Sequence, residues 1–240
     1  MLPLLLALTV AVAVGDDAEA LEKFKADIKG KDGAGRAAAV EELAKTSSPK
    51  VCSKLASLLT NEVVEVKISA AKGFEIQEDK KHAAVYLLNG AQANAKEFTV
   101  LAAILEALGK VKEEIGAPEI NKHFSEEDVA LAKSAVDAAG DLKSASSFDP
   151  LIKELKKCEA LLQPQNNNGG GGGGRFGGLG RFGGGGTNGQ NPREARMRAQ
   201  ELKTEIMKVL TEMAGVHCQD GADWENWWKE HRATWKPAKS

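Results

Sequence analysis

Residues 100–109 read Val-Leu-Ala-Ala-Ile-Leu-Glu-Ala-Leu-Gly, an apolar run with a single charged position. Val100, Ile104 and Leu108 are spaced four residues apart, which places them on one face of an α-helix. Ala and Leu have high helix propensities, and a glycine suits a helix C-terminus. We therefore predict a buried amphipathic helix that ends near Gly109.

Three other segments share this pattern, at 37–44, 66–75 and 131–140. Aligned on Ala44, Glu75, Gly109 and Gly140, the four segments follow one another after 31, 34 and 31 residues. A second apolar stretch follows each of them, and we expect these second helices at 49–60, 79–96, 118–124 and 150–163. One helix pair of this length cannot bury its own apolar face, so neighbouring pairs must stack.

The helix that closes on Ala-Leu-Gly at 107–109 resembles the first helix of a HEAT repeat, and the resemblance extends over 36–163. With Trp224, Trp227 and Trp228 near its C-terminus, the chain is also similar to the small secreted bacterial proteins of this kind, which have a Trp-rich C-terminal end. The resemblance implies an all-α fold: a right-handed α-α superhelix, or HEAT/armadillo-like solenoid, of about four to five helix pairs. It also implies that the second helices line the concave side.

The ends of the chain and one internal segment differ from this pattern. Residues 1–15 are predicted to be a signal peptide, because thirteen residues suit a secretory h-region and are too few to span a membrane; a buried N-terminal helix is the alternative. A cap helix and four repeats follow at 16–163. The Gly-rich residues 164–192 are expected to form a disordered loop. A last helical unit then covers 193–236, and residues 237–240 form a tail.

Polar residues indicate where several of these helices begin. Ser48 and Asn191 precede prolines and suit N-caps, as does Asp149 before Pro150. Ser125 and Asp128 suggest a capping box, and Asp223 is expected to cap the last helix.

Three tryptophans in the last helix, Trp224, Trp227 and Trp228, share one face because they lie at i, i+3 and i+4. We interpret them as a hydrophobic cap over the final helical unit. A surface that stacks on a sugar or peptide is the alternative.

Composition argues against several classes of function. The chain has 240 residues and a net charge of −2, which disfavours nucleic-acid binding by bulk charge. The repeated Arg-Phe-Gly-Gly at 175–178 and 181–184 supplies only two arginines, so we predict no nucleic-acid partner.

No residues suggest a catalytic centre or a cofactor site. His217, Cys218, Asp220 and Asp223 lack the paired spacing of a zinc site, so no metal is expected. The cysteines are expected to be buried free thiols, and a disulfide between Cys158 and Cys218 is the alternative.

The distribution of charge suggests a binding surface. The expected first helices carry a net −5 and the second helices a net +5. We therefore predict a non-catalytic protein-interaction scaffold that receives an acidic partner segment on a basic concave surface. The residues of this surface are Lys50, Lys54, Lys81, Lys122, Lys153 and Lys157. Two alternatives are a subunit of a protein-modifying enzyme, and a cell-surface or polysaccharide-associated protein that uses the Trp segment. Export is expected to place the protein in the periplasm or outside the cell, with no integral membrane segment after signal removal.

Overall fold

The computed structural model describes residues 16–163 and 191–237. The predicted signal peptide and residues 164–190 of the predicted Gly-rich loop lie outside them, whereas Asn191 and Pro192, which that prediction also included, cap and begin a helix. The described residues contain eleven α-helices, three short 3-10 helices and no strand, which confirms the all-α class. Contacts divide the chain into two compact units, unit 1 up to Ser144 and unit 2 from Ala145 onward.

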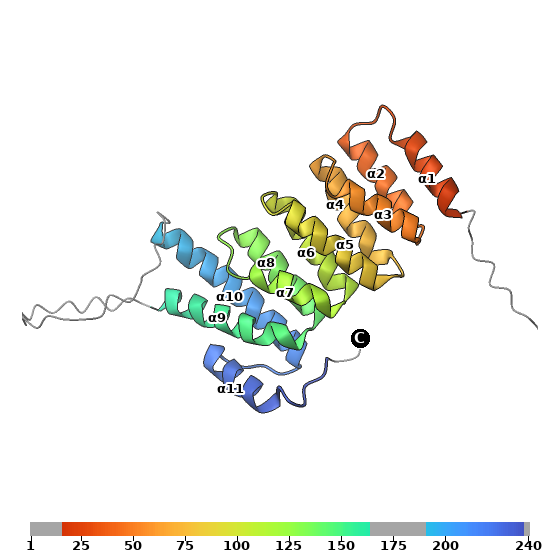
Figure 1. Cartoon of the computed structure of the whole chain (residues 1–240). Coiled ribbons are helices and arrows are strands. Elements are labelled where there is room, and N and C mark those ends of the chain that lie inside the picture. The colour runs from red at the N-terminus through yellow and green to blue at the C-terminus, as the bar shows by residue number, and fades with distance from the viewer. Residues whose placement is uncertain (1–15, 164–190, 238–240) are drawn as a thin grey trace, which may run out of the picture. The chain divides into compact units, whose positions relative to one another are not determined.

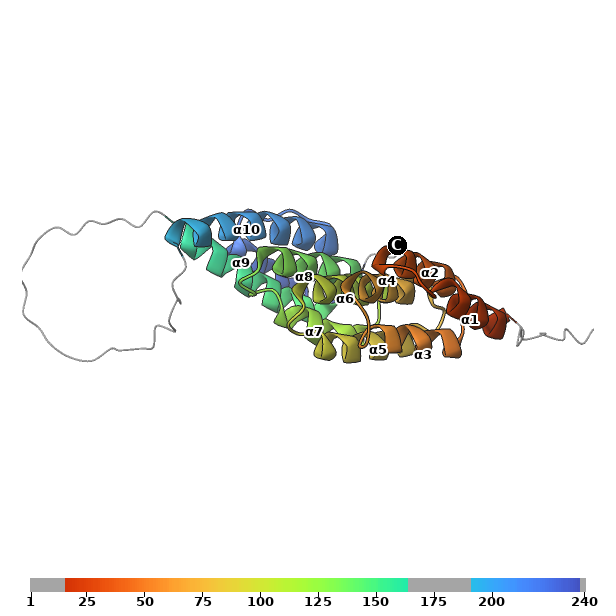
Figure 2. The ribbon, with the colours of Figure 1, turned by 90° about the horizontal axis from the view of Figure 1, so that it is seen from above.

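Unit 1 holds two rows of helices (Figures 1 and 2). The first helices are α2 (Gly33–Ala44), α4 (Val64–Gly73), α6 (Phe98–Val111) and α8 (Val129–Leu142), and each packs on the next in this row. The second row contains α3 (Pro49–Leu58), α5 (Lys80–Ala93) and α7 (Ala117–Lys122). Helix α1 (Asp16–Asp27) packs on α2 and α3.

The four first helices begin in the register that the sequence predicts. Their first residues, Gly33, Val64, Phe98 and Val129, are separated by 31, 34 and 31 residues, the steps found from the sequence alignment. The aligned apolar positions Leu43, Phe74, Leu108 and Ala139 are all buried. The predicted repeat phase is therefore correct in unit 1.

Small residues let neighbouring first helices approach closely. A Cβ atom added to Gly109 on α6 would lie 2.6 Å from the carbonyl oxygen of Ala138 on α8. A Cβ on Gly73 of α4 would lie 2.9 Å from the Cβ of Ala44 on α2. Both distances are shorter than ordinary van der Waals contact, so these positions require glycine.

Two buried side-chain amides each connect the end of one helix to the end of the helix before it in the same row. Gln77 follows α4 and donates from Nε2 to the carbonyl of Gly73 at 3.2 Å and to that of Ala44, at the end of α2, at 2.8 Å. Asn94 follows α5 and donates from Nδ2 to Gly90 O at 2.8 Å and to Leu59 O, at the end of α3, at 2.9 Å. We call these residues amide clamps. They donate to carbonyls in the last turns of these helices, where main-chain partners run out; Gly90 O also accepts from the Asn94 N–H.

A second repeated contact lies between the first helices. Ser69 on α4 donates to Glu41 on α2, and Ser134 on α8 donates to Glu106 on α6; the donor lies 28 positions after the acceptor in both pairs. The repeat is thus visible in polar contacts as well as in the core.

The predicted N-cap residues were correct for some helices and wrong for others. Ser48 accepts a hydrogen bond from Val51 N and Asn191 accepts one from Arg193 N, as expected for N-caps. The capping box at Ser125 was wrong, because α8 begins at Val129 and is capped by Asp128. Two other acidic caps were also misplaced. Asp149 lies inside the first turn of α9, and Asp220 rather than Asp223 caps α11.

Unit 2 contains α9 (Phe148–Leu162), α10 (Pro192–Ala214) and α11 (Gly221–His231), and α9 packs on both of the others. The sequence grouped 150–163 with 126–143 as a fourth pair, whereas the contacts assign α9 to the unit that holds α10 and α11. Glu159 on α9 links all three helices of this unit. It pairs with Lys203 of α10 at 3.2 Å and accepts from Gly221 N of α11 at 3.1 Å.

Candidate protein-interaction surfaces

Two of the six predicted lysines contact the N-terminal helix α1. Lys50 Nζ lies 3.4 Å from Asp17 Oδ2, and Lys54 Nζ lies 5.5 Å from the centre of the Phe24 ring. Lys50 is exposed and Lys54 is half-buried. These contacts help to hold α1 against α3, so both lysines have a role within unit 1 itself.

The other four lysines are exposed at separate places. Lys122 ends α7 and pairs with Glu119 at 2.5 Å, while Lys157 on α9 pairs with Glu154 at 2.7 Å. Lys81 is the second residue of α5 and Lys153 lies on α9, and neither forms an ion pair with a carboxylate among the described residues. Lys153 and Lys157 belong to unit 2 and the others to unit 1. Four of the six therefore already have a carboxylate or an aromatic ring beside them.

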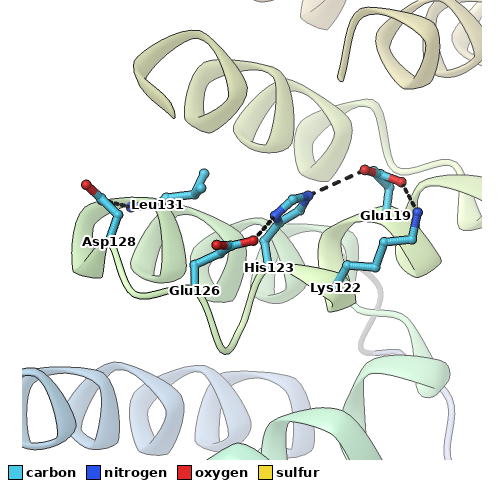
Figure 3. Close-up of polar contacts among 6 residues, drawn as sticks. All are labelled: Glu119, Lys122, His123, Glu126, Asp128 and Leu131. Carbon is cyan, nitrogen blue, oxygen red and sulfur yellow. Dashed lines mark hydrogen bonds and ion pairs between the residues drawn. The ribbon is translucent and has the colours of Figure 1, made fainter. Parts of the chain in front are cut away.

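A histidine is held between two carboxylates where α7 ends (Figure 3). His123 Nδ1 lies 2.9 Å from Glu126 Oε1, and Nε2 lies 3.4 Å from Glu119 Oε1. The His123 side chain is only 13% exposed. Both ring nitrogens can donate at the same time only in the protonated ring. The cluster thus links α7 to the turn that precedes α8.

Glu119 is the centre of this cluster, because it also accepts from Lys122. Burial alone would raise the pKa of Glu119, but hydrogen bonds from Lys122 and His123 outweigh burial and lower the pKa below its usual value. The sequence contained a signal for this cluster that we did not use. Glu119, Lys122, His123 and Glu126 have the i+3 and i+4 spacing of neighbours on a helix.

The described residues contain no group of three or more His, Cys, Asp or Glu side chains arranged to hold a metal ion. In the candidate cluster near 217–223, Asp220 instead accepts from the N–H groups of Ala222 and Asp223, and Asp223 accepts from Gln219 N.

All three cysteines are free thiols, so Cys158 and Cys218 are not paired. Cys52 and Cys158 are buried, and Cys218 is half-buried. Burial, with a smaller contribution from Glu154, raises the pKa of Cys158 to about 11. Such a thiol is a poor nucleophile at neutral pH.

The tryptophans of α11 pack mainly on α9. Trp224 is fully buried and Trp228 is 5% exposed, while Trp227 is half-buried. The Phe148 ring stacks on Trp228 with 4.2 Å between centroids, and Trp235 contacts the Phe148 ring edge-on at 5.0 Å. Two of the three predicted residues thus contribute to the core of unit 2.

Among the grooves on the described residues, three are open and lie between helices. One of about 210 Å³ lies between α1 and α2, and one of about 290 Å³ lies between α1 and α3. A third, of about 440 Å³, lies where α9 ends and α10 begins. Its lining residues are Leu162, Pro192, Arg193, Arg196, Met197 and Gln200. The sequence analysis missed this groove, although its signal was present: Arg193, Arg196 and Arg198 all precede Ala199, the first buried residue of α10.

No helix among the described residues combines the length and apolarity needed to cross a membrane. Comparisons with protein-family models, with curated proteins and with solved structures found no significant match to this chain.

Proposed function

We propose that this chain is a non-catalytic scaffold, a HEAT-like helical solenoid that binds another protein along its second helices. The observation that supports the proposal most directly is the repeated register of α2, α4, α6 and α8, with amide clamps in both rows. Stacked helix pairs of this kind offer broad open surfaces rather than a closed pocket. The three grooves fit this view, because each is open and each lies between helices.

Within this proposal, the basic surface depends most on Lys81 and Lys153. Lys50, Lys54, Lys122 and Lys157 already interact inside the chain, so a partner would have to compete for them. An exposed lysine without a carboxylate partner costs less to engage, because no existing ion pair must be broken. We therefore expect Lys81→Glu to slow association more than Lys122→Glu does.

Site-specific crosslinking tests the scaffold proposal. A photo-crosslinking residue replaces Asn89, exposed on the second helix α5, or Lys72, exposed on the first helix α4. Exposed substitutions such as these leave the core intact. A protein adduct that forms from position 89 and not from position 72 is the expected result. Equal adducts at both positions, or none at either, would contradict binding along the second helices.

Export is part of the same proposal. Helix α1 lies wholly after the expected cleavage site, so removal of residues 1–15 would leave every described contact in place, including Lys50–Asp17. The test is N-terminal sequencing of the protein recovered from its native source. A first residue at Asp16 is expected, and an intact Met1 would contradict cleavage.

A further inference from the structure

The first two turns of α10 extend beyond the part of the helix that is buried. Residues 192–198 contain no buried residue, and burial begins at Ala199 and continues to Met213. A helical segment without a buried face gains little stability from packing within its own unit. Met197 in this segment is 57% exposed, and Leu161 at the end of α9 is 46% exposed. Exposed apolar side chains of this size, beside a groove, mark a surface for contact.

The groove in this region combines an apolar floor with positive charge. Leu162, Pro192 and Met197 supply apolar surface, and the only charged residues in the lining are Arg193 and Arg196. Neither guanidinium group has a carboxylate partner among the described residues, and both side chains are exposed. Arginine is well suited to bind carboxylates, because its planar guanidinium can donate two parallel hydrogen bonds.

The chain's own Gly-rich segment is a poor occupant for this groove. Residues 164–190 contain Arg175 and Arg181 and no Asp or Glu, so they would bring further positive charge to Arg193 and Arg196. Like charges brought together at an interface oppose binding. Charge complementarity therefore favours an acidic partner.

We propose that the groove between the end of α9 and the start of α10 binds a protein segment in which a bulky apolar side chain is flanked by carboxylates. The apolar side chain packs against Leu162 and Met197, and the carboxylates accept hydrogen bonds from Arg193 and Arg196. This inference deepens the proposed scaffold function and rests on it. It adds a binding site and the chemistry of the segment that fills it.

A fluorescence-anisotropy titration of the full chain tests the site. The probe is a short labelled peptide with a central Leu-Phe pair between Asp and Glu residues. One control peptide carries Asn and Gln in place of the acids, and another carries Ser-Ser in place of Leu-Phe. We expect saturable binding of the first peptide alone.

Protein variants locate the binding. Arg196→Glu and Lys236→Glu make the same change of charge in unit 2, at exposed residues that form no ion pair with a carboxylate among the described residues. We expect Arg196→Glu and Met197→Ser each to weaken binding by about tenfold or more, and Lys236→Glu to change it by less than about twofold. Tryptophan fluorescence of each variant verifies that unit 2 is folded.

Three outcomes would overturn the inference. They are the absence of saturable binding, an equal loss in Arg196→Glu and Lys236→Glu, and binding that occurs only after deletion of 165–190. The last outcome would assign the groove to the chain's own segment. The crosslinker at position 89 separates this inference from the scaffold proposal. If only the groove inference is wrong, the Arg196→Glu variant still forms the adduct from position 89. If the scaffold proposal is wrong, no such adduct forms even when Arg196 is present.

Discussion

Replacement of Gly109 by alanine should destabilise unit 1, although alanine is the better helix former. A Cβ atom at this position would lie 2.6 Å from Ala138 O and 2.8 Å from Ala138 Cα, against about 3.4 Å for an ordinary contact. These atoms are backbone, so α6 and α8 must move apart by several tenths of an ångström. Overpacking of this kind costs about 1–3 kcal/mol, and the gain in helix propensity is about 1 kcal/mol. Because the atoms that the new Cβ meets are backbone, the cost should lie in the upper part of this range, at about 2–3 kcal/mol, which leaves a net loss of about 1–2 kcal/mol.

Gly35→Ala in α2 is the matched control for this substitution. A Cβ at Gly35 would lie 3.1 Å from Lys31 Cβ and Cδ and 3.2 Å from Asp32 Oδ1. These atoms belong to exposed side chains that can move by a few tenths of an ångström, so the same chemical change should stabilise by up to about 1 kcal/mol. Urea unfolding followed by far-UV circular dichroism measures both variants. Since all four tryptophans lie in unit 2, their fluorescence records that unit separately. A Gly109→Ala variant as stable as the unmodified protein would refute the close approach of α6 and α8.

Three further predictions concern the core, an acidic residue and the thiols. Leu108→Ala should cost about 2–5 kcal/mol of unfolding free energy in urea, because this residue is fully buried, whereas Lys110→Ala should stay within about 0.5 kcal/mol. The lowered pKa of Glu119 stabilises the fold above its unfolded value of about 4.5, and this contribution is lost as the pH falls through the folded pKa. Glu119→Gln should therefore lose less stability than the unmodified protein between about pH 5 and about pH 3; an equal loss would exclude Glu119 as a contributor. Native-state alkylation at about pH 8, followed by peptide mass spectrometry, should modify half-buried Cys218 before buried Cys158, and the reverse order would contradict their burial.

The sequence predicted the period of unit 1 because a helix face is a local property. Apolar residues four apart mark the buried face of each first helix, and the structure has the same register of 31, 34 and 31 residues. Helix caps were harder to predict, since several short polar residues compete within one turn. Tertiary packing selects among them, as Asp128 and Asp220 illustrate.

Contacts between residues that are far apart in the chain have no periodic pattern in the sequence that would predict them. The amide clamps join Gln77 to Ala44 and Asn94 to Leu59, over 33 and 35 residues. Net charge per helix identified a basic second row but could not reveal that Lys50 faces Asp17, because the two residues come from different helices. The assignment of α9 to unit 2 likewise depends on contacts with α10 and α11, which the sequence does not specify.

The amide clamps have a consequence for how such a chain can change its length. Each clamp reaches the preceding repeat at a main-chain carbonyl, a group that every amino acid provides. The preceding helix therefore needs no particular side chain at that position, and a duplicated repeat brings its own donor with it. Gene duplication within this segment could add a helix pair while the new junction keeps the same hydrogen bond. Recombinant chains with one extra copy of 64–97 would then gain length in a single step without matched changes in their neighbours.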